Sequence, residues 1–167
     1  FCFKQNQALP IFAQQNVVEA LKNRFDYIFA TENRYPGAPS VHINVIKEFV
    51  PFEVQGKFVE PIAVLHGDLP ILGYKFNKFA YLTDVKFLPE ETINKLQNLD
   101  VLVINALRIT EHPTHNNLEQ ALAFIQILKP KKAYITHIGF QLGFHEEVQK
   151  SLPKNVYLAY DNLQLIL

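Results

Sequence analysis

The sequence has little of what disulfide-bonded or membrane-spanning proteins need. Its 167 residues contain a single cysteine, Cys2, which excludes an internal disulfide framework and is typical of a reducing compartment. No apolar stretch approaches the roughly 20 residues that a membrane-spanning helix requires. There is no glycine-rich phosphate loop, no serine nucleophile elbow and no paired-cysteine metal motif. These absences favour a cytoplasmic domain with no membrane partner.

The chain also lacks net charge. Sixteen basic and sixteen acidic side chains cancel, so no strong field gathers polyanions. We therefore expect extended nucleic-acid binding to be unfavourable, whereas a small phosphorylated ligand is compatible with this balance. The sequence has no Met and opens on Phe1, with no signal-peptide pattern. We expect it to be part of a longer protein, and its first residues then carry no information about targeting.

What is present indicates a compact globule. The apolar share is 49% and the aromatic share 13%, and the length is that of one domain or part of one. Hydrophobic periodicity predicts strands at residues 9–13, 42–46, 52–54, 58–65, 71–76, 79–83, 101–105, 133–136, 156–159 and 163–166. Helices are predicted at residues 16–25, from Pro89 onward, at 117–128 with Asn116 as cap, and at 145–150. This order indicates an α/β (α+β) fold with a mixed sheet and helices on its exposed face.

Three of the predicted strands end in the same way. His66, Asp84 and His137 each follow a short apolar run, as a buried strand that delivers one polar group to a sheet edge would. Each alone is more simply a structural histidine or a capping aspartate. Functional groups of α/β proteins gather at the carboxyl ends of strands, however, and two imidazoles with a carboxylate suit Zn, Mn or Fe. The sequence therefore predicts a metal site if these three ends meet.

Other polar residues have two interpretations each. His112 and His115 could chelate a metal or place a general acid, or they are solvated residues of a loop before a helix. Arg108, just after a strand, could hold a phosphate with its planar fork or form a surface ion pair. Asp161 follows Tyr160 in a predicted turn, where an ordinary turn role is the simpler account.

These residues together resemble the metallo-β-lactamase superfamily, and within it the cyclic-phosphate phosphodiesterases related to phosphoribosyl 1,2-cyclic phosphate phosphodiesterase. The resemblance covers essentially the whole chain. It is carried by VLHGDLPILGY (residues 64–74), YLTD (81–84), NALR (105–108), HPTHNNLEQAL (112–122), YITHI (134–138), LGFHEEV (142–148) and LAYD (158–161), with QALPIFA (7–13) upstream.

The resemblance implies an αββα sandwich, two divalent ions (Zn or Mn) and a small phosphate ester as substrate, hydrolysed by a two-metal-activated hydroxide. By it, His66 would be a ligand of one metal, Asp84 the bridging carboxylate and His137 a ligand of the second. His115 would act as general acid or phosphate contact. His112 and Arg108 would lie on the substrate side.

Two departures from the family pattern have consequences. The His-x-His-x-Asp-His motif, which supplies four more ligands, is absent, so residues 1–167 are expected to be the C-terminal portion of a single hydrolase domain. This portion alone is expected to be metal-poor and nearly inactive. Relatives often read Thr-His-Ile-Ser-His where this chain has Gly139-Phe140 after Ile138, which puts substrate preference in doubt.

The alternatives are another hydrolase of the same superfamily (a tRNA 3′-end nuclease, or a thioester or lactam hydrolase) and a non-catalytic interaction module that has lost its metals. An exposed sheet face, where the first strands of the family fold belong, is also expected to favour self-association, for instance as a homodimer.

Overall fold

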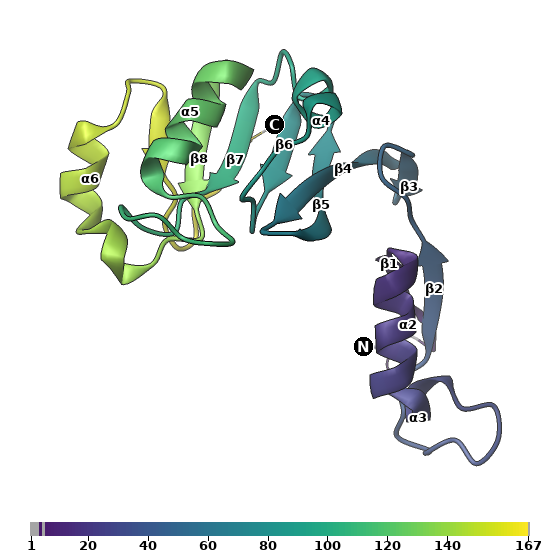
Figure 1. Ribbon diagram of the computed structural model, residues 1–167. Helices are drawn as coiled ribbons and strands as arrows, with labels where there is room; N and C mark the ends of the chain where they lie inside the picture. The colour runs from purple at the N-terminus through teal and green to yellow at the C-terminus, as the bar shows by residue number, and fades with distance from the viewer. Residues whose placement is uncertain (1–3, 5, 167) are drawn as a thin grey trace. The chain divides into compact units, whose positions relative to one another are not determined.

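The computed structural model describes residue 4 and residues 6–166, and the chain divides into two compact units, Phe1–Val50 and Pro51–Leu167. Cys2 lies outside the described residues, so the expectation drawn from it stays a prediction. Figure 1 shows the elements of both units. No helix in the described part of the chain is long and apolar enough to cross a bilayer.

The first unit is one strand–helix–strand motif. It contains β1 (Leu9–Ala13), α2 (Gln15–Arg24), α3 (Asp26–Phe29) and β2 (Val41–Val45). The two strands pair in parallel, with Leu9 opposite Val41 and Ala13 opposite Val45. Parallel neighbours need a crossover, which the two helices provide. Val18 of α2, 2% exposed, is buried by this arrangement.

The second unit holds a seven-stranded mixed sheet in the order β3-β4-β5-β6-β7-β8-β9. Its strands are β3 (Phe52–Val54), β4 (Lys57–His66), β5 (Leu69–Phe76), β6 (Phe79–Leu82), β7 (Val101–Asn105), β8 (Lys132–Thr136) and β9 (Val156–Leu158). Strands β3 to β6 form an antiparallel meander, in which Asn77 at φ 53° lies in the hairpin turn between β5 and β6. Strands β6 to β9 are parallel.

Three helices connect the parallel strands: α4 (Glu90–Lys95), α5 (Leu118–Leu128) and α6 (His145–Ser151), the last preceded by the short 3₁₀ helix η1 (Phe140–Leu142). Because parallel crossovers are right-handed, all three helices lie on one face of the sheet. There α4 packs on β4, α5 on β7 and α6 on β9 (Figure 1). The side chains of the sheet beneath them are 0% exposed: Ala80, Leu82, Leu102, Ile104, Ala133 and Ile135. This face is the core of the unit.

Two local predictions were wrong. The cap of α5 is Asn117, not Asn116: its side chain accepts from the Gln120 N–H at 2.9 Å, and the Gln120 side chain accepts from the Asn117 N–H at 3.2 Å. Asn116 is buried, and its N–H is bound to the carbonyl of Val85. Residues 163–166 form no strand. Among the described residues, β9 is the last strand of the seven-stranded sheet.

Candidate metal centre

The topology of the sheet explains why distant residues meet. Strand β4 is antiparallel to β5 and β5 to β6, so β4 runs in the same direction as β6, β7, β8 and β9. These five strands therefore end at one edge of the sheet, which we call the carboxyl edge. His66 is the last residue of β4, Asp84 follows β6 and His137 follows β8. The predicted convergence of the three strand ends is what the structure shows.

The backbone turns sharply where each of these strands ends. Asp84 has φ 60° and His137 has φ 55°, both in the left-handed region, and Gly67 directly after His66 has φ 63°. Asp and His tolerate this region better than most residues, and Gly adopts it freely. Such strained positions are common at functional sites. Here the turns keep the polar side chains at the carboxyl edge while the chain leaves the sheet.

His66 has a defined tautomer. Its Nδ1 lies 3.0 Å from the backbone carbonyl oxygen of Asp84. Because a carbonyl can only accept, Nδ1 carries a proton and donates it, which leaves Nε2 as the nitrogen that can offer a lone pair to a metal. A histidine oriented by a hydrogen bond from its other nitrogen is the usual form of a metal ligand.

The Asp84 carboxylate is the centre of a cluster of imidazoles. Its Oδ1 lies 2.9 Å from Nε2 of His115 and 3.5 Å from Nε2 of His137. The His115 ring is stacked on that of His137 at 4.9 Å and meets that of His66 edge-on at 4.5 Å. His66, Asp84 and His115 are half-buried, whereas His137 is exposed. Four of the predicted site residues thus surround one small volume.

A buried asparagine fixes the backbone beside Asp84. Asn105, 0% exposed at the end of β7, accepts from the Val85 N–H at 2.7 Å and donates to the Val85 carbonyl at 3.1 Å. The amide therefore pairs with both backbone groups of the residue that follows Asp84. The sequence placed Asn105 at a strand end and in the NALR segment of the resemblance but gave it no role, because a clamp across 20 residues leaves no local pattern.

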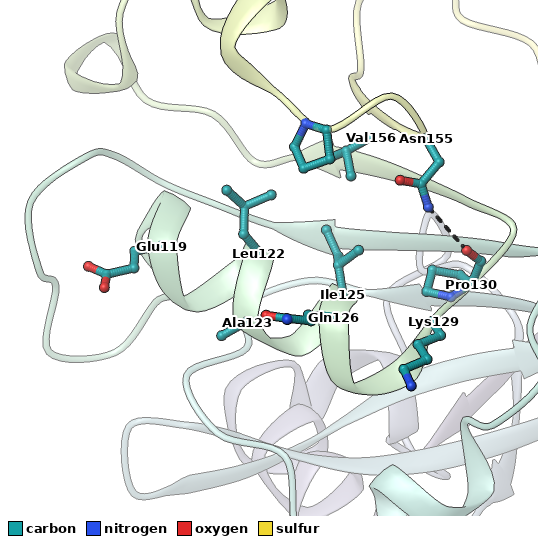
Figure 2. A pocket seen from close by; sticks show the side chains of 10 residues that line it. Glu119, Leu122, Ala123, Ile125, Gln126, Lys129, Pro130, Asn155 and Val156 are labelled. Atoms are coloured by element: carbon teal, nitrogen blue, oxygen red, sulfur yellow. Dashed lines mark hydrogen bonds between the residues drawn. The ribbon is translucent and has the colours of Figure 1, made fainter.

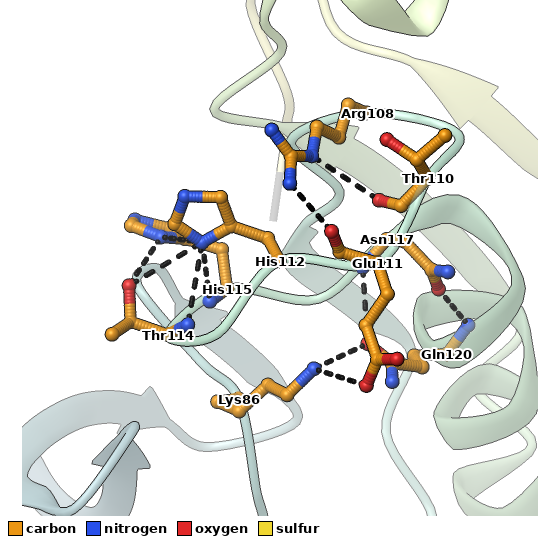
Figure 3. A network of polar contacts seen from close by, with 9 residues as sticks. All are labelled: Lys86, Arg108, Thr110, Glu111, His112, Thr114, His115, Asn117 and Gln120. Carbon is orange, nitrogen blue, oxygen red and sulfur yellow. Dashed lines mark hydrogen bonds and ion pairs between the residues drawn. The ribbon is translucent and has the colours of Figure 1, made fainter.

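Residues 110–117, which we call the histidine loop, bring His112 and His115 to the carboxyl edge (Figure 3). The N–H groups of Thr114 and His115 both donate to Nδ1 of His112 at 3.3 Å, so His112 orders the loop from inside. The Thr114 hydroxyl lies 3.0 Å from Nδ1 of His115. Thr114 also touches Gly67, where an added Cβ would lie 3.0 Å from its methyl group. The histidine loop is thus packed directly on the turn after His66.

Two cations hold the outer side of this loop. The guanidinium of Arg108 donates to the carbonyls of Thr110 at 3.3 Å and Glu111 at 2.5 Å, and to the Gln141 side chain at 3.3 Å. Lys86 donates to the side chain of Gln120 at 3.1 Å and lies 3.5 Å from that of Glu111 (Figure 3). Arg108 therefore fastens the loop here, and its predicted contact with substrate stays a prediction.

The environment favours neutral rings in the loop. Burial is the largest influence lowering the pKa of His115; the nearby His66 and His137 act in the same direction, and the bond to Asp84 opposes them. Burial also lowers the pKa of His112, followed by the charges of His115, Arg108, Lys86 and His66. Both pKa values lie below the ordinary 6.5, so both rings are mainly neutral at pH 7 and can offer a lone pair or an N–H.

The donor set fits a divalent metal ion. One ligand atom each from His66, Asp84 and His115 lies within 4.8 Å of the others. Two imidazole nitrogens and a carboxylate oxygen are the ligands that Zn and Mn accept. His115, rather than the predicted His137, is the third member of this compact group, while Nε2 of His137 lies 3.5 Å from the same Asp84 oxygen and its ring stacks on that of His115. The ligand roles themselves remain predictions.

The second unit also has a groove away from the carboxyl edge. A cavity of about 650 Å³ runs along α5, lined by residues of that helix, of the turn after it and of the segment at the start of β9: Glu119, Leu122, Ala123, Ile125, Gln126, Lys129, Pro130, Pro153, Asn155 and Val156 (Figure 2). It contains none of the predicted site residues. We place the chemistry at the carboxyl edge, where the histidines and the carboxylate are.

Comparison with known proteins is consistent with this placement. A family model described as a β-lactamase superfamily domain matches residues 2–138. An octanoyltransferase of Porphyromonas gingivalis (strain ATCC BAA-308 / W83) is 36% identical over 163 residues, which are 97% of this chain and 33% of that protein. The chain therefore spans about a third of the length of that curated relative.

Two solved structures show the same architecture. A diphosphatase from the PhnP family is 34% identical with a TM-score of 0.84, over 95% of this chain and 58% of that one. Zn²⁺-bound PqqB from Methylobacterium extorquens is 15% identical with a TM-score of 0.73, over 99% of this chain and 67% of that one. The chain, with its large mixed sheet of the αββα sandwich class, belongs to the metallo-β-lactamase superfamily of metal-dependent hydrolases.

Proposed function

We propose that the chain is the C-terminal portion of a metal-dependent phosphodiesterase domain that hydrolyses a small phosphate ester, such as a cyclic ribose phosphate. The observation that carries this proposal is the cluster at the carboxyl edge. There the Asp84 carboxylate lies 2.9 Å from the imidazole of His115 and 3.5 Å from that of His137, and the Asp84 carbonyl orients His66. The 34% identity to a PhnP-family diphosphatase supports phosphorus chemistry.

Each residue has a role in this proposal. His66 would bind one metal through Nε2, which its tautomer leaves free. Asp84 has two carboxylate oxygens and would bridge two metals, and His137 would bind the second. A pair of divalent ions bound there would supply a water of lowered pKa and positive charge for the phosphoryl oxygens. The other ligands would come from a His-x-His-x-Asp-His segment, which residues 1–167 do not contain.

The histidine loop would contact the substrate and supply the general acid. His115 donates its Nε2–H to Asp84 in this structure, and this is the proton that it would present to a leaving oxygen. His112 holds the loop backbone behind His115, and its exposed side would face substrate. Arg108 would add positive charge for the phosphate while keeping the loop in place.

Metal content and hydrolysis test the proposal together. The 167-residue chain and the longer natural protein are each titrated with Mn²⁺ and Zn²⁺, and hydrolysis of bis(p-nitrophenyl) phosphate and of cyclic ribose phosphates is followed. We expect the longer protein to bind two ions and to turn over, and the chain alone to bind metal weakly and to be nearly inactive. Hydrolysis that needs no metal, or a metal-loaded longer protein that cleaves none of these esters, contradicts the proposal.

A second candidate follows from the curated relative. Because a protein named octanoyltransferase is 36% identical over nearly this whole chain, an acyl compound is the other substrate class to test. A thioester or lactam hydrolase of the same superfamily would use the same metal centre. Octanoyl transfer and thioester hydrolysis belong in the same panel, and activity on these but not on phosphate esters would favour this candidate.

The remaining alternatives are a tRNA-processing nuclease and a non-catalytic module. The balanced charge of the chain counts against the nuclease. The module would have shed its metals, so a longer protein without the His-x-His-x-Asp-His segment and without bound metal would favour it.

A further inference from the structure

The hydroxyl of Thr114 lies between two imidazoles of the histidine loop (Figure 3). Its Oγ1 is 3.0 Å from Nδ1 of His115 and 3.4 Å from Nδ1 of His112. A hydroxyl has one proton to donate, so only one of these nitrogens can receive it fully. The other hydrogen bonds of the two rings decide which nitrogen that is.

Nδ1 of His112 already has donors. The backbone N–H groups of Thr114 and His115 both point to it, each at 3.3 Å. Because these groups can only donate, this Nδ1 is the unprotonated nitrogen of its ring. Its single lone pair is shared between two backbone donors, and the hydroxyl is the most distant of the three neighbours. The hydroxyl proton therefore goes to the nearer nitrogen, Nδ1 of His115.

The other nitrogen of His115 must carry a proton. Its Nε2 lies 2.9 Å from Oδ1 of Asp84, and an ionised carboxylate only accepts. A neutral imidazole has one proton, so a ring that is protonated at Nε2 has an acceptor at Nδ1. That acceptor is the nitrogen 3.0 Å from the Thr114 hydroxyl. The hydroxyl thus donates to one side of the ring, and the ring donates to Asp84 from the other.

The same cluster also permits a competing tautomer. Nδ1 of His115 lies 3.2 Å from Nδ1 of His112. If the proton of His115 moved to Nδ1, it would be donated to His112, and the lone pair of Nε2 would face the Asp84 carboxylate. With the proton on Nε2, two ring lone pairs face each other instead, which is unfavourable unless a donor lies close to both. The Thr114 hydroxyl is the side chain that occupies this position.

We propose that Thr114 is a positioning residue that fixes the tautomer of His115. Its hydroxyl donates to Nδ1 and so keeps the ring proton on Nε2, beside Asp84. The proposal rests on the proposed function and deepens it, since this Nε2–H is the proton that His115 would present to a leaving oxygen. The tautomer is nevertheless a property of the chain itself and is measurable without turnover.

NMR of the imidazole nitrogens tests the assignment directly. The chain is labelled with ¹⁵N-histidine and observed at about pH 8, above the ordinary imidazole pKa of about 6.5, so that neutral rings dominate. We expect wild-type His115 to be protonated at Nε2 and unprotonated at Nδ1. Thr114→Val keeps the branched shape but removes the hydroxyl. It should move the tautomer ratio about threefold to tenfold toward Nδ1–H, the effect of one hydrogen bond.

Three further variants give the matched comparison. Thr114→Ser keeps the hydroxyl and loses only the methyl group, so it should retain the wild-type tautomer ratio. Thr110→Val makes the valine exchange at an exposed position of the same loop and should also leave the ratio unchanged. Thr114→Ala removes the hydroxyl without adding an atom, and it gives the same reading if circular dichroism shows that valine disturbs the fold.

The leaving group provides a second reading in the longer natural protein. p-Nitrophenolate leaves without a proton, whereas the ribose oxygen of a cyclic phosphate needs one. Thr114→Val should therefore lower kcat for a cyclic ribose phosphate in proportion to the lost Nε2–H population, with KM unchanged. It should leave kcat for bis(p-nitrophenyl) phosphate within about twofold of wild type, and Thr114→Ser should restore both. Equal losses of kcat on the two esters would contradict the role of Thr114.

The outcomes separate the two proposals. A wild-type His115 with its proton on Nδ1, or a tautomer ratio that Thr114→Val leaves unchanged, overturns the role of Thr114. Equal shifts in Thr114→Ser and Thr114→Val would assign the effect to the methyl group and also overturn it. If the tautomer shifts in Thr114→Val but not in Thr114→Ser, and the metal-loaded longer protein cleaves no phosphate ester, Thr114 still fixes His115 and the phosphodiesterase proposal fails.

Discussion

Asp84 and His137 have left-handed backbone conformations, with φ of 60° and 55°. For a non-glycine residue this conformation costs roughly 1–2 kcal/mol. The surrounding bonds offset that cost: Asn105 clamps Val85, and His66 donates to the carbonyl of Asp84. At the scale of single residues, the centre is thus a set of strained turns held by a few specific hydrogen bonds.

The variant Asp84→Asn separates the effect of the carboxylate charge from the effect of the strained backbone at this position. Asn tolerates φ near 60° as well as Asp does, so Asp84→Asn should keep the fold while removing the anionic ligand. In the longer protein we expect metal-dependent hydrolysis to fall at least about 100-fold. Loss of a hydrogen bond that supports a metal ligand costs about 10- to 100-fold, and loss of the ligand itself should cost at least as much. Metal analysis and kinetics check this, with circular dichroism to confirm folding. Unchanged metal content would remove Asp84 from the ligand set.

The clamp made by Asn105 predicts a stability effect. Asn105→Ala leaves the Val85 N–H buried without a partner, which should cost about 1–3 kcal/mol, while the Val85 carbonyl keeps the Asn116 N–H as its donor. Urea unfolding should show this loss, together with weaker metal binding because Asp84 adjoins Val85. Asn94→Ala, on the exposed side of α4, is the matched control and should change stability by less than about 0.5 kcal/mol. Equal losses in both variants would show that the clamp is not what stabilises this turn.

At the scale of elements, alanine substitutions at two glycines distinguish the cost of backbone strain from the cost of a close contact with the histidine loop. Gly67 and Gly56 both have positive φ, 63° and 77°, so alanine at either should cost about 1 kcal/mol or more. Only at Gly67 would the new Cβ contact another loop, 3.0 Å from the Thr114 methyl group, whereas nothing lies within 4 Å at Gly56. We expect both variants to be destabilised but only Gly67→Ala to weaken metal binding. Partial recovery by Thr114→Ser in the Gly67→Ala background would confirm the contact.

Helix α4 is attached to the sheet by an ion-pair network that predicts a pH dependence. Glu60 on β4 lies 3.2 Å from Lys75 on β5 and 3.2 Å from Lys95 on α4. Burial, the largest influence, raises the pKa of Glu60, but the bonds and charges of Lys95 and Lys75 outweigh it, and the pKa lies below its ordinary 4.5. A lowered pKa means that the stabilisation is complete above the unfolded-state value and is lost as pH falls through the folded-state value.

Glu60→Gln should therefore destabilise the protein by about 0.5–1 kcal/mol at pH 7, since the network is partly exposed. The difference from wild type should shrink as the pH is lowered below about 4.5, which urea unfolding at several pH values can follow. Glu53→Gln, at an exposed position on β3, is the control and should show no such pH-dependent difference. A Glu60→Gln effect that is constant with pH would assign the loss to packing instead.

The sequence indicated the elements better than their long-range contacts. The apolar runs before His66, Asp84 and His137 predicted both the strands and the shared edge, because parallel strands end together. By contrast, the hydrogen bond from His115 to Asp84 depends on how the histidine loop folds back across 31 residues. The position of the α5 cap was missed by one residue, because Asn116 and Asn117 are equally good caps and only burial distinguishes them.

At the scale of the whole molecule, the seven-stranded sheet has two unlike faces. Opposite the helices, side chains in register across five strands form a row that we call the tyrosine face: Tyr74, Tyr81, Val103, Tyr134 and Tyr157. Tyr134 and Tyr157 stack at 5.3 Å, and burial raises the pKa of Tyr74. Tyr81 is nevertheless 43% exposed. In an αββα sandwich the corresponding face packs against a second sheet.

We propose that this face drives self-association of the 167-residue chain. Large apolar areas on soluble proteins mark interaction sites, and aromatic residues contribute most to such contacts. Light scattering after gel filtration should show a mass that rises with concentration in the micromolar range. Tyr81→Lys should shift the chain toward monomer, because it places a charge in the middle of the row, whereas Phe58→Lys, at a 67% exposed position on β4 outside the row, should not. A chain that is monomeric at all concentrations, or that Phe58→Lys dissociates equally well, would show that the tyrosine face is not the contact.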